Sequence, residues 1–306
     1  MPASSLISVD GIRKTYGRTT AVDGLSFDVQ PGEIFGLIGP NGAGKTTTME
    51  CVEGLRRPDA GAISVFGVDP WTERRALQQR LGVQLQQAQL QKRIKVREAV
   101  AFWASLYPRA VDTEDLIGRL GLSDKRNAWF MTLSGGQKQR LFIALALVND
   151  PELVFLDELT TGLDPQARRA IWDLVRGVRA RGKTVFLTTH LMEEAERLCD
   201  RVAIIDHGRI VDIGTPSALV ARHCPERTLI ITVDDAASLD RLRDMNGATL
   251  VASDGLKVSF RGDRPGFLTD VLSAVADSGV RVRDIRTEIP TLEDVFLKLT
   301  GHGIRD

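Results

Sequence analysis

The chain has 306 residues, a length that predicts one large domain or two of medium size. Hydrophobic residues make up 43% and charged residues 26%, values that are typical of a globular protein and argue against disorder and collagen-like repeats. The 40 Lys and Arg residues balance the 40 Asp and Glu residues, which disfavours a polycation that binds nucleic acid non-specifically.

The spacing of the cysteines and the length of the apolar runs exclude further classes of protein. Cys51, Cys199 and Cys224 lie far apart and without CxxC spacing, which argues against a disulfide framework or a thiolate zinc site and predicts reduced thiols in the cytoplasm. The longest apolar run, residues 141–148, is well short of the ~20 residues that span a membrane, and the N-terminal sequence lacks the pattern of a signal peptide. If the protein works at a membrane, we expect another polypeptide to span it.

The first two thirds of the chain predict an α/β core. Alternating segments at 6–9 and 26–29 indicate antiparallel strands. Short continuous apolar runs are typical of parallel strands buried on both faces, and they occur at 34–38, 153–156, 184–188 and 202–205. Helical patterns lie between these runs, at 46–55, 136–148 and 165–181. Strands that alternate with helices predict a mostly parallel sheet, and the long stretch between the first two apolar runs predicts a helical insertion.

The tail predicts a small domain of its own. Strand patterns occur at 229–233, 249–252, 257–261 and 280–288, and helical patterns at 236–245, 265–278 and 292–300. The order strand-helix-strand-strand-helix-strand predicts a ferredoxin-like α+β domain. We therefore expect one domain at 1–222, with a helical subdomain at about 87–148, and a second domain at 223–306.

A glycine-rich sequence follows the apolar strand at 34–38 and precedes a helix. Residues 39–46 match G-x-x-x-x-G-K-[ST], with the members Gly39, Pro40, Asn41, Gly42, Ala43, Gly44, Lys45 and Thr46. Glycines let the backbone form a nest of N–H groups around a phosphate, and the helix adds its positive end. In this pattern Lys45 reaches the β- and γ-phosphates, the Thr46 hydroxyl is a ligand for Mg²⁺, and Thr47 lies next to the bound ATP.

Two adjacent carboxylates end the apolar strand at 153–156. An acid at the C-terminal end of a parallel strand lies in the crevice where open α/β sheets bind their ligands. We expect Asp157 to hold Mg²⁺ and Glu158 to act as the general base that polarises the water attacking the γ-phosphate.

The sequence Leu133-Ser134-Gly135-Gly136-Gln137 opens another helix. Ser134 is a good N-cap residue, but two glycines directly after a cap are poor helix formers. The two glycines favour a helix start whose backbone a ligand must approach closely. The exposed N–H groups at this helix start suit a γ-phosphate.

In chain order the three motifs are the glycine-rich loop, the sequence at 133–137 and the apolar strand that ends in Asp157 and Glu158. This order resembles the ATP-binding subunit of an ABC protein, and the resemblance covers residues 6–215. It implies a P-loop NTPase fold with an antiparallel β subdomain, a mostly parallel core sheet and a helical subdomain. It also implies a head-to-tail homodimer in which each ATP lies between the P-loop of one subunit and, in trans, Ser134, Gly135, Gly136 and Gln137 of the other.

The resemblance assigns four further residues. Tyr16 would stack on the adenine, Gln86 would contact Mg²⁺ and link the core to the helical subdomain, Asp164 would communicate across the dimer, and His190 would contact the γ-phosphate. Most relatives have Pro at the position of Leu159, so we expect a somewhat looser loop there with no chemical group missing.

The C-terminal residues resemble one group of proteins within this family. Residues 290–297, PTLEDVFL, resemble the end of daunorubicin-resistance exporter ATPases, which work with a separate permease. This implies a motor subunit for a drug-like or lipophilic compound, bound through its permease at the cytoplasmic side of the membrane, with no nucleic-acid partner. Phe102, Trp103 and Tyr107 then line the groove that meets the permease, although their helical spacing is also typical of a core. The alternatives are a soluble ABC ATPase acting on nucleic acid or ribosomes, and an importer ATPase.

Overall fold

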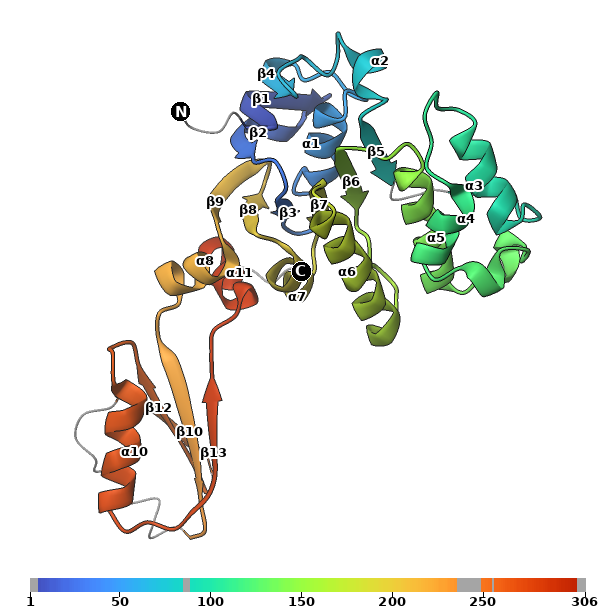
Figure 1. Ribbon diagram of the computed structural model, residues 1–306. Helices are drawn as coiled ribbons and strands as arrows, with labels where there is room; N and C mark the ends of the chain where they lie inside the picture. The colour runs from blue at the N-terminus through green and yellow to red at the C-terminus, as the bar shows by residue number, and fades with distance from the viewer. Residues whose placement is uncertain (1–4, 85–88, 236–248, 255, 302–306) are drawn as a thin grey trace. The chain divides into compact units, whose positions relative to one another are not determined.

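The computed structural model describes residues 5–84, 89–235, 249–254 and 256–301 (Figure 1). The chain divides into two compact units, one made of 1–216 with 299–306 and the other of 217–298. The division falls at the start of α8 (Pro216–His223), whereas the sequence placed the domain boundary after residue 222. The division into domains at 1–222 and 223–306 stays a prediction.

A three-stranded antiparallel sheet, in the order β2-β1-β4, forms one layer of the larger unit. It consists of β1 (Ile7–Tyr16), β2 (Thr19–Val29) and β4 (Ala60–Val65). The strands are longer than the expected segments because bulges at Gly11 and Gly24 interrupt the alternation that predicts them. Phe27 of β2 stacks on Phe35, 5.4 Å between ring centroids, and so joins this sheet to the core sheet below it.

The core sheet has six strands in the order β5-β6-β7-β3-β8-β9. Its members are β3 (Ile34–Ile38), β5 (Leu81–Gln84), β6 (Leu153–Asp157), β7 (Thr184–Thr189), β8 (Arg201–Asp206) and β9 (Arg209–Gly214). All neighbouring pairs are parallel except β8 with β9. The carboxyl ends of the parallel strands therefore meet at one edge, which is where the predicted motifs follow their strands.

Helices cover this sheet and form a separate lobe beside it. The core helices are α1 (Lys45–Val52), α2 (Arg74–Leu77), α6 (Pro165–Ala180) and α7 (Met192–Leu198). The helical subdomain contains α3 (Val96–Ala104), α4 (Thr113–Arg119) and α5 (Gly135–Leu147), with short 3₁₀ turns at Ser123–Lys125 and Phe130–Thr132. In Figure 1 this subdomain, in teal and green, lies beside β5 and β6, as the α5 contacts with β5 also require. The expected helical insertion is thus confirmed.

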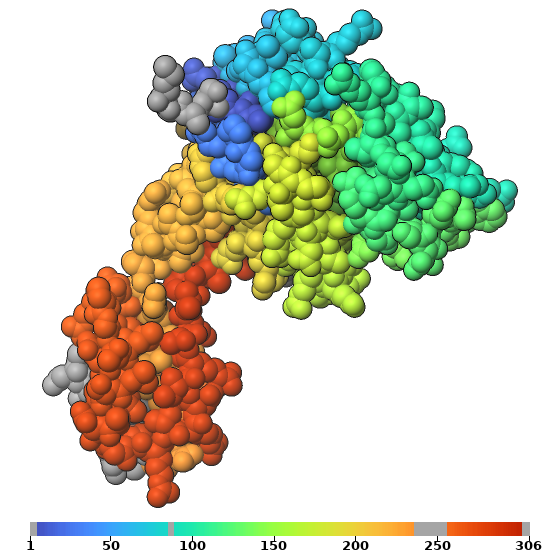
Figure 2. Space-filling view, in the orientation of Figure 1, coloured from blue at the N-terminus to red at the C-terminus, as the bar shows by residue number. Residues whose placement is uncertain are grey.

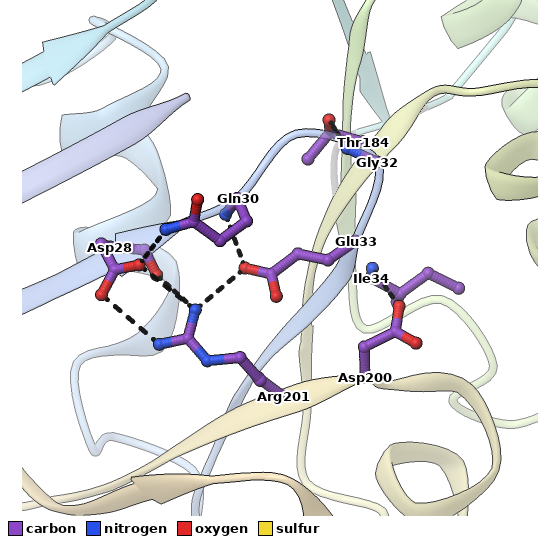
Figure 3. Close-up of polar contacts among 8 residues, drawn as sticks. All are labelled: Asp28, Gln30, Gly32, Glu33, Ile34, Thr184, Asp200 and Arg201. Atoms are coloured by element: carbon purple, nitrogen blue, oxygen red, sulfur yellow. Dashed lines mark hydrogen bonds and ion pairs between the residues drawn. The ribbon is translucent and has the colours of Figure 1, made fainter. Parts of the chain in front are cut away.

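A polar network holds the amino ends of the core strands, at the edge opposite to the motifs (Figure 3). The Arg201 guanidinium lies 3.2 Å from both Asp28 Oδ2 and Glu33 Oε1, and the Asp200 carboxylate accepts from the backbone N–H of Ile34 at 2.9 Å. Thr184 accepts from the N–H of Gly32 at 2.9 Å. These contacts tie the start of β3 to the starts of β7 and β8.

The smaller unit is built on a four-stranded antiparallel sheet in the order β11-β12-β10-β13. The strands are β10 (Arg227–Val233), β11 (Thr249–Asp254), β12 (Lys257–Gly262) and β13 (Val282–Glu288), and α10 (Phe267–Asp277) packs Phe267, Val271 and Val275 on one face. This strand order is that of the predicted ferredoxin-like topology. The helix expected at 236–245 lies outside the described residues, so the complete assignment stays a prediction. The last helix, α11, runs over Leu292–Thr300.

In the described part of the chain, no helix combines the length and apolar character that crossing a membrane requires.

Candidate functional site

The glycine-rich loop connects β3 to α1 and depends on its glycines. Gly42 and Gly44 have φ values of 82° and 101°, which favour glycine strongly. A Cβ at Gly44 would lie 2.2 Å from the carbonyl oxygen of Ala21, and one at Gly39 would lie 2.1 Å from that of Ile205. The backbone therefore passes too close to its neighbours for any side chain at these two positions, as the phosphate-binding loop pattern predicts.

Lys45 begins α1 and folds back over the loop. Its ammonium donates to the carbonyl oxygens of Gly39 and Pro40, at 2.8 Å each, and the residue is 4% exposed. Burial lowers the pKa of this ammonium, while the charges of Glu158 and Asp157 act in the opposite direction. A buried cation within a ring of backbone groups is a strong attractor for a phosphate.

The Thr46 hydroxyl and Asp157 lie together although 111 positions separate them in the sequence. Thr46 Oγ1 donates to Asp157 Oδ2 at 3.3 Å, and the Thr188 hydroxyl on β7 donates to Asp157 Oδ1. Burial and the neighbouring Glu158 charge raise the pKa of Asp157. The hydrogen bonds from Thr188 and Thr46 and the charge of Lys45 act in the opposite direction without cancelling this rise. A hydroxyl and a carboxylate that converge in this way are hard oxygen ligands and fit Mg²⁺.

Glu158 has a backbone conformation that is rare for a residue with a side chain. Its φ is 46°, and its N–H donates to the carbonyl oxygen of Thr188 at 3.1 Å and to the Thr188 hydroxyl at 3.3 Å. Strained backbone of this kind persists where the surrounding structure fixes it, often at functional sites. The turn brings Glu158 Oε1 to 3.5 Å from Nδ1 of His190, which follows β7. The predicted base and the predicted γ-phosphate contact are therefore neighbours.

The start of α5 has the predicted cap. Ser134 Oγ accepts from the N–H of Gln137 at 3.3 Å, and Gln137 Oε1 accepts from the N–H of Ser134 at 3.0 Å, which makes a capping box. Gly136 also lies close to α6, because a Cβ there would be 3.1 Å from Ala167 Cβ. Packing within the chain is thus a further reason for this glycine. Figure 1 shows α5 apart from α1, with β6 and α6 between them in the view.

Asp164 is the N-cap of α6, and its carboxylate accepts from the N–H of Ala167 at 2.8 Å. Tyr16 ends β1 and is 41% exposed, with the Arg56 guanidinium 5.1 Å from its ring centroid. Leu159 is 2% exposed and packs in the interior. Gln86 lies outside the described residues. The roles of Tyr16, Asp164 and Gln86 stay predictions.

A buried carboxylate that the sequence did not point to joins the loop after Glu158 to two helices. Glu194 on α7 is 1% exposed and its Oε1 accepts from Thr160 Oγ1 at 2.8 Å and from Trp172 Nε1 at 2.9 Å. Sequence reasoning missed this residue because it lies among other acids on an ordinary helical pattern. The contact holds the loop at 158–164 against α6 and the helix that follows His190.

Two of the three aromatic residues expected to line a groove lie at a cavity. Trp103 and Tyr107 line a cavity of about 400 Å³ between β5, α3 and α5, whereas Phe102 is 55% exposed and is not part of its lining. That this cavity is the groove that meets the permease stays a prediction. Glu53, at the end of α1, lies at the same cavity and is 6% exposed. Burial, with the charges of Asp157 and Glu50, raises its pKa to about 8.

The fold and these contacts define a P-loop nucleotide-binding protein, and comparison with known proteins gives its family. Residues 22–161 match the family model described as ABC transporter. The Nod factor export ATP-binding protein I of Paraburkholderia xenovorans is 41% identical over 100% of both chains. The daunorubicin resistance ATP-binding protein DrrA3 of Streptomyces coeruleorubidus is 37% identical over 99% of this chain and 98% of its own length. The chain belongs to the ATP-binding subunits of ABC transporters, and it is an ATPase of that family.

Solved structures of ABC ATP-binding subunits have the same fold over about 70% of the chain. An ATP-binding subunit of an ABC transporter is 28% identical, with a TM-score of 0.64 over 71% of this chain and 93% of that chain. CbiO1 of Clostridium perfringens, part of the CbiONQ complex, is 25% identical with a TM-score of 0.64 over 72% and 96%.

Proposed function

We propose that this chain hydrolyses ATP to energise export of a drug-like or lipophilic compound through a separate permease. The observation that carries the ATPase part is the convergence of Thr46, Asp157, Glu158 and His190 beside the loop that holds Lys45. The export part rests on relatives that are named for Nod factor export and daunorubicin resistance, one of them matching over the whole chain. These names favour the exporter over an importer or a soluble ATPase that acts on nucleic acid or ribosomes.

The residues divide the chemistry among themselves. Lys45 and the N–H groups of the loop bind the β- and γ-phosphates, Tyr16 stacks on the adenine, and Thr46, Asp157 and Gln86 hold Mg²⁺. When bound, Mg²⁺ supplies charge neutralisation on the phosphate oxygens. Glu158 accepts or orients a proton of the attacking water, and His190 keeps this carboxylate in place and contacts the γ-phosphate.

We further propose that the site is completed in a homodimer. Ser134, Gly135, Gly136 and Gln137 would lie against the γ-phosphate bound to the other subunit, with Asp164 between the two sites. The exposed cap of α5 supports this arrangement, because its N–H groups form a helix start that is open to an anion. Closure would reach the permease through Gln86 and the cavity beside Trp103 and Tyr107, at the cytoplasmic side of the membrane.

The test is co-purification of this chain with its permease from detergent-solubilised membranes, followed by phosphate-release assays with and without candidate compounds. We expect a lipophilic compound to stimulate Mg-ATP hydrolysis in the complex and to have no effect on a Glu158→Gln complex. Hydrolysis by a chain that associates with no membrane protein would contradict the export part and leave the ATPase part standing. Absence of Mg-dependent hydrolysis in the complex would contradict both.

A further inference from the structure

One carboxylate lies at a mostly apolar cavity, the space of about 400 Å³ that Trp103 and Tyr107 line. In Figure 2 the helical subdomain, in teal and green, packs against the core of the larger unit, and the cavity is lined from both of these parts. Leu81 comes from the core strand β5, and Leu145 comes from α5 of the subdomain. Among the described residues that line the cavity, Glu53 is the only Asp, Glu, Lys, Arg or His.

The backbone holds Glu53 at this cavity. Glu53 is the C-cap of α1, and the N–H of Leu55 donates to the carbonyl oxygen of Glu50 at 2.9 Å, which closes the last turn of the helix. Gly54 has a φ of 71°, and a Cβ at this position would lie 2.2 Å from the carbonyl oxygen of Pro70. The chain cannot shift here without breaking these contacts, so the Glu53 side chain stays at the cavity.

The Glu53 carboxylate is unpaired in the described part of the chain. It takes part in no hydrogen bond or ion pair with any described residue, although Glu53 is only 6% exposed. The charges that act on it, from Asp157 and Glu50, have the same sign as its own. The carbonyl end of α1 adds a partial negative charge. An ionised acid in these surroundings costs free energy, and a cation beside it would offset much of that cost.

We propose that Glu53 receives the side chain of a Lys or Arg from a cytoplasmic segment of the permease, an inference that rests on the export function proposed above. Cytoplasmic segments of membrane proteins carry an excess of Lys and Arg. The aliphatic stem of either residue packs on apolar walls while its charged end reaches the carboxylate. Leu55 and Leu106, which are 41% and 60% exposed at the same cavity, suit apolar residues next to that cation.

A metal ion suits this cavity less well. Mg²⁺ and Ca²⁺ bind through about six or more oxygen ligands, whereas the described lining offers one carboxylate and the side-chain amides of Gln78 and Gln79. Within the described ranges, no group of three or more His, Cys, Asp and Glu residues is placed to hold a metal ion. The charge and the lining therefore favour a basic side chain as the occupant.

Pairing of this kind couples binding to the release of a proton. In the chain alone, the pKa of about 8 keeps the Glu53 carboxyl largely protonated at neutral pH. The cation binds the ionised form, so binding expels a proton and tightens as the pH rises toward about 8. Tyr107 is the other titratable residue in the described lining, and burial raises its pKa above the ordinary value of 10.0, so it stays neutral over this range.

The test titrates the full chain against the permease that co-purifies with it, in detergent, at pH 6 and at pH 8. We expect the wild-type affinity to be about tenfold or more higher at pH 8, because a large part of the Glu53 carboxyl is already ionised there. Glu53→Gln should bind at least ~10-fold more weakly than the wild-type chain at pH 8, and with little dependence on pH. Replacing each Lys and Arg of the cytoplasmic segments of the permease by Gln should identify one that weakens binding equally and adds nothing to Glu53→Gln.

The control is Glu193→Gln, which removes a carboxylate from the exposed side of α7, outside the described cavity lining. It should bind the permease as the wild-type chain does at both pH values. Urea unfolding of Glu53→Gln at both pH values checks that this variant is folded. If Glu53→Gln keeps the wild-type affinity and its pH dependence, the proposal is overturned and the export function stands.

Two other outcomes also overturn the proposal. A chain that co-purifies with no membrane protein contradicts the export function and this inference together. Loss of the homodimer in Glu53→Gln, with unchanged binding to the permease, assigns the cavity to a second copy of the chain.

Discussion

Glu158 brings together a buried carboxylate, a left-handed backbone and a histidine neighbour within one residue. The backbone costs of order 1–3 kcal/mol, which the hydrogen bonds from its N–H to Thr188 help to offset. Its side chain is only 10% exposed and lies 3.5 Å from His190. This placement fits a group that orients one water molecule and is shielded from the rest.

We therefore expect Glu158→Gln to bind Mg-ATP normally and to hydrolyse it ~10²–10⁴-fold more slowly, because the amide keeps the shape and removes the base. Since ATP binds the closed dimer in preference to open monomers, the dimer should accumulate. Phosphate release and size-exclusion chromatography with and without Mg-ATP measure the two effects. Glu193→Gln, on the exposed side of α7, is the control. Near-normal phosphate release by Glu158→Gln would remove the residue from its proposed role.

Glu53 predicts an unusual pH dependence of stability. Its pKa of about 8 in the folded chain, against an ordinary value of 4.5, means that the folded state holds a proton that the unfolded state has lost. Stability therefore falls as the pH rises from about 4.5 to about 8. Glu53→Gln removes this loss. The free energy of unfolding of Glu53→Gln, minus that of the wild-type chain, should therefore be larger at pH 8 than at pH 5 by roughly 2–4 kcal/mol, since each tenfold change in proton affinity corresponds to ~1.4 kcal/mol. Urea unfolding at both pH values measures it, with Glu73→Gln as an exposed control; identical pH profiles for wild type and Glu53→Gln would contradict it.

At the scale of elements, the carboxyl ends and the amino ends of the core strands have different roles. The carboxyl ends of β3, β6 and β7 deliver Lys45, Asp157 and His190 to one edge of the sheet, because parallel strands point the same way. The amino ends of β3 and β8 are held by the Arg201 network at the opposite edge. One edge is thus used for chemistry and the other for stability.

Arg201→Met should therefore lower the free energy of unfolding without changing the site. The Glu33 side chain is 10% exposed and would lose its cation, so we expect a cost of about 2 kcal/mol, between the values for exposed and fully buried ion pairs. Urea unfolding of the full chain measures it. Arg176→Met is the matched control, since its partner Asp173 is 75% exposed, and it should cost no more than about 0.5 kcal/mol. Equal effects of the two substitutions would show that the network adds nothing.

The cap of α5 allows a test of the shared site. Ser134→Arg puts a bulky cation at the start of this helix, so ATP binding by one subunit should persist while hydrolysis fails. Lys45→Ala should also abolish hydrolysis, but for a different reason: it removes the cation that binds phosphate from the subunit's own loop. Mixing the two inactive variants leaves one intact pair of surfaces in each mixed dimer, and phosphate release should partly return. No recovery in proven mixed dimers would contradict the trans arrangement.

At the scale of the whole molecule, some features of the fold could be predicted from local sequence patterns and others could not. The glycine conformations of the phosphate-binding loop and the cap of α5 were predictable, because each depends on residues that are close in sequence. Helix ends were less predictable: α1 stops at Val52 because Gly54, with a φ of 71°, ends the turn that apolar spacing alone would continue. The extent of β1 and β2 also escaped the pattern, since bulges shift its period.

The sequence by itself determined the family and the α/β core and pointed to the residues that we propose carry the chemistry, because glycine conformations, caps and apolar runs act over a few neighbouring positions. Only the tertiary structure decided which distant groups meet. It placed Thr46 on Asp157, turned Glu158 toward His190, and buried Glu53 and Glu194. Such contacts depend on how strands are ordered in a sheet and how helices pack on it, and no spacing along the chain encodes them directly.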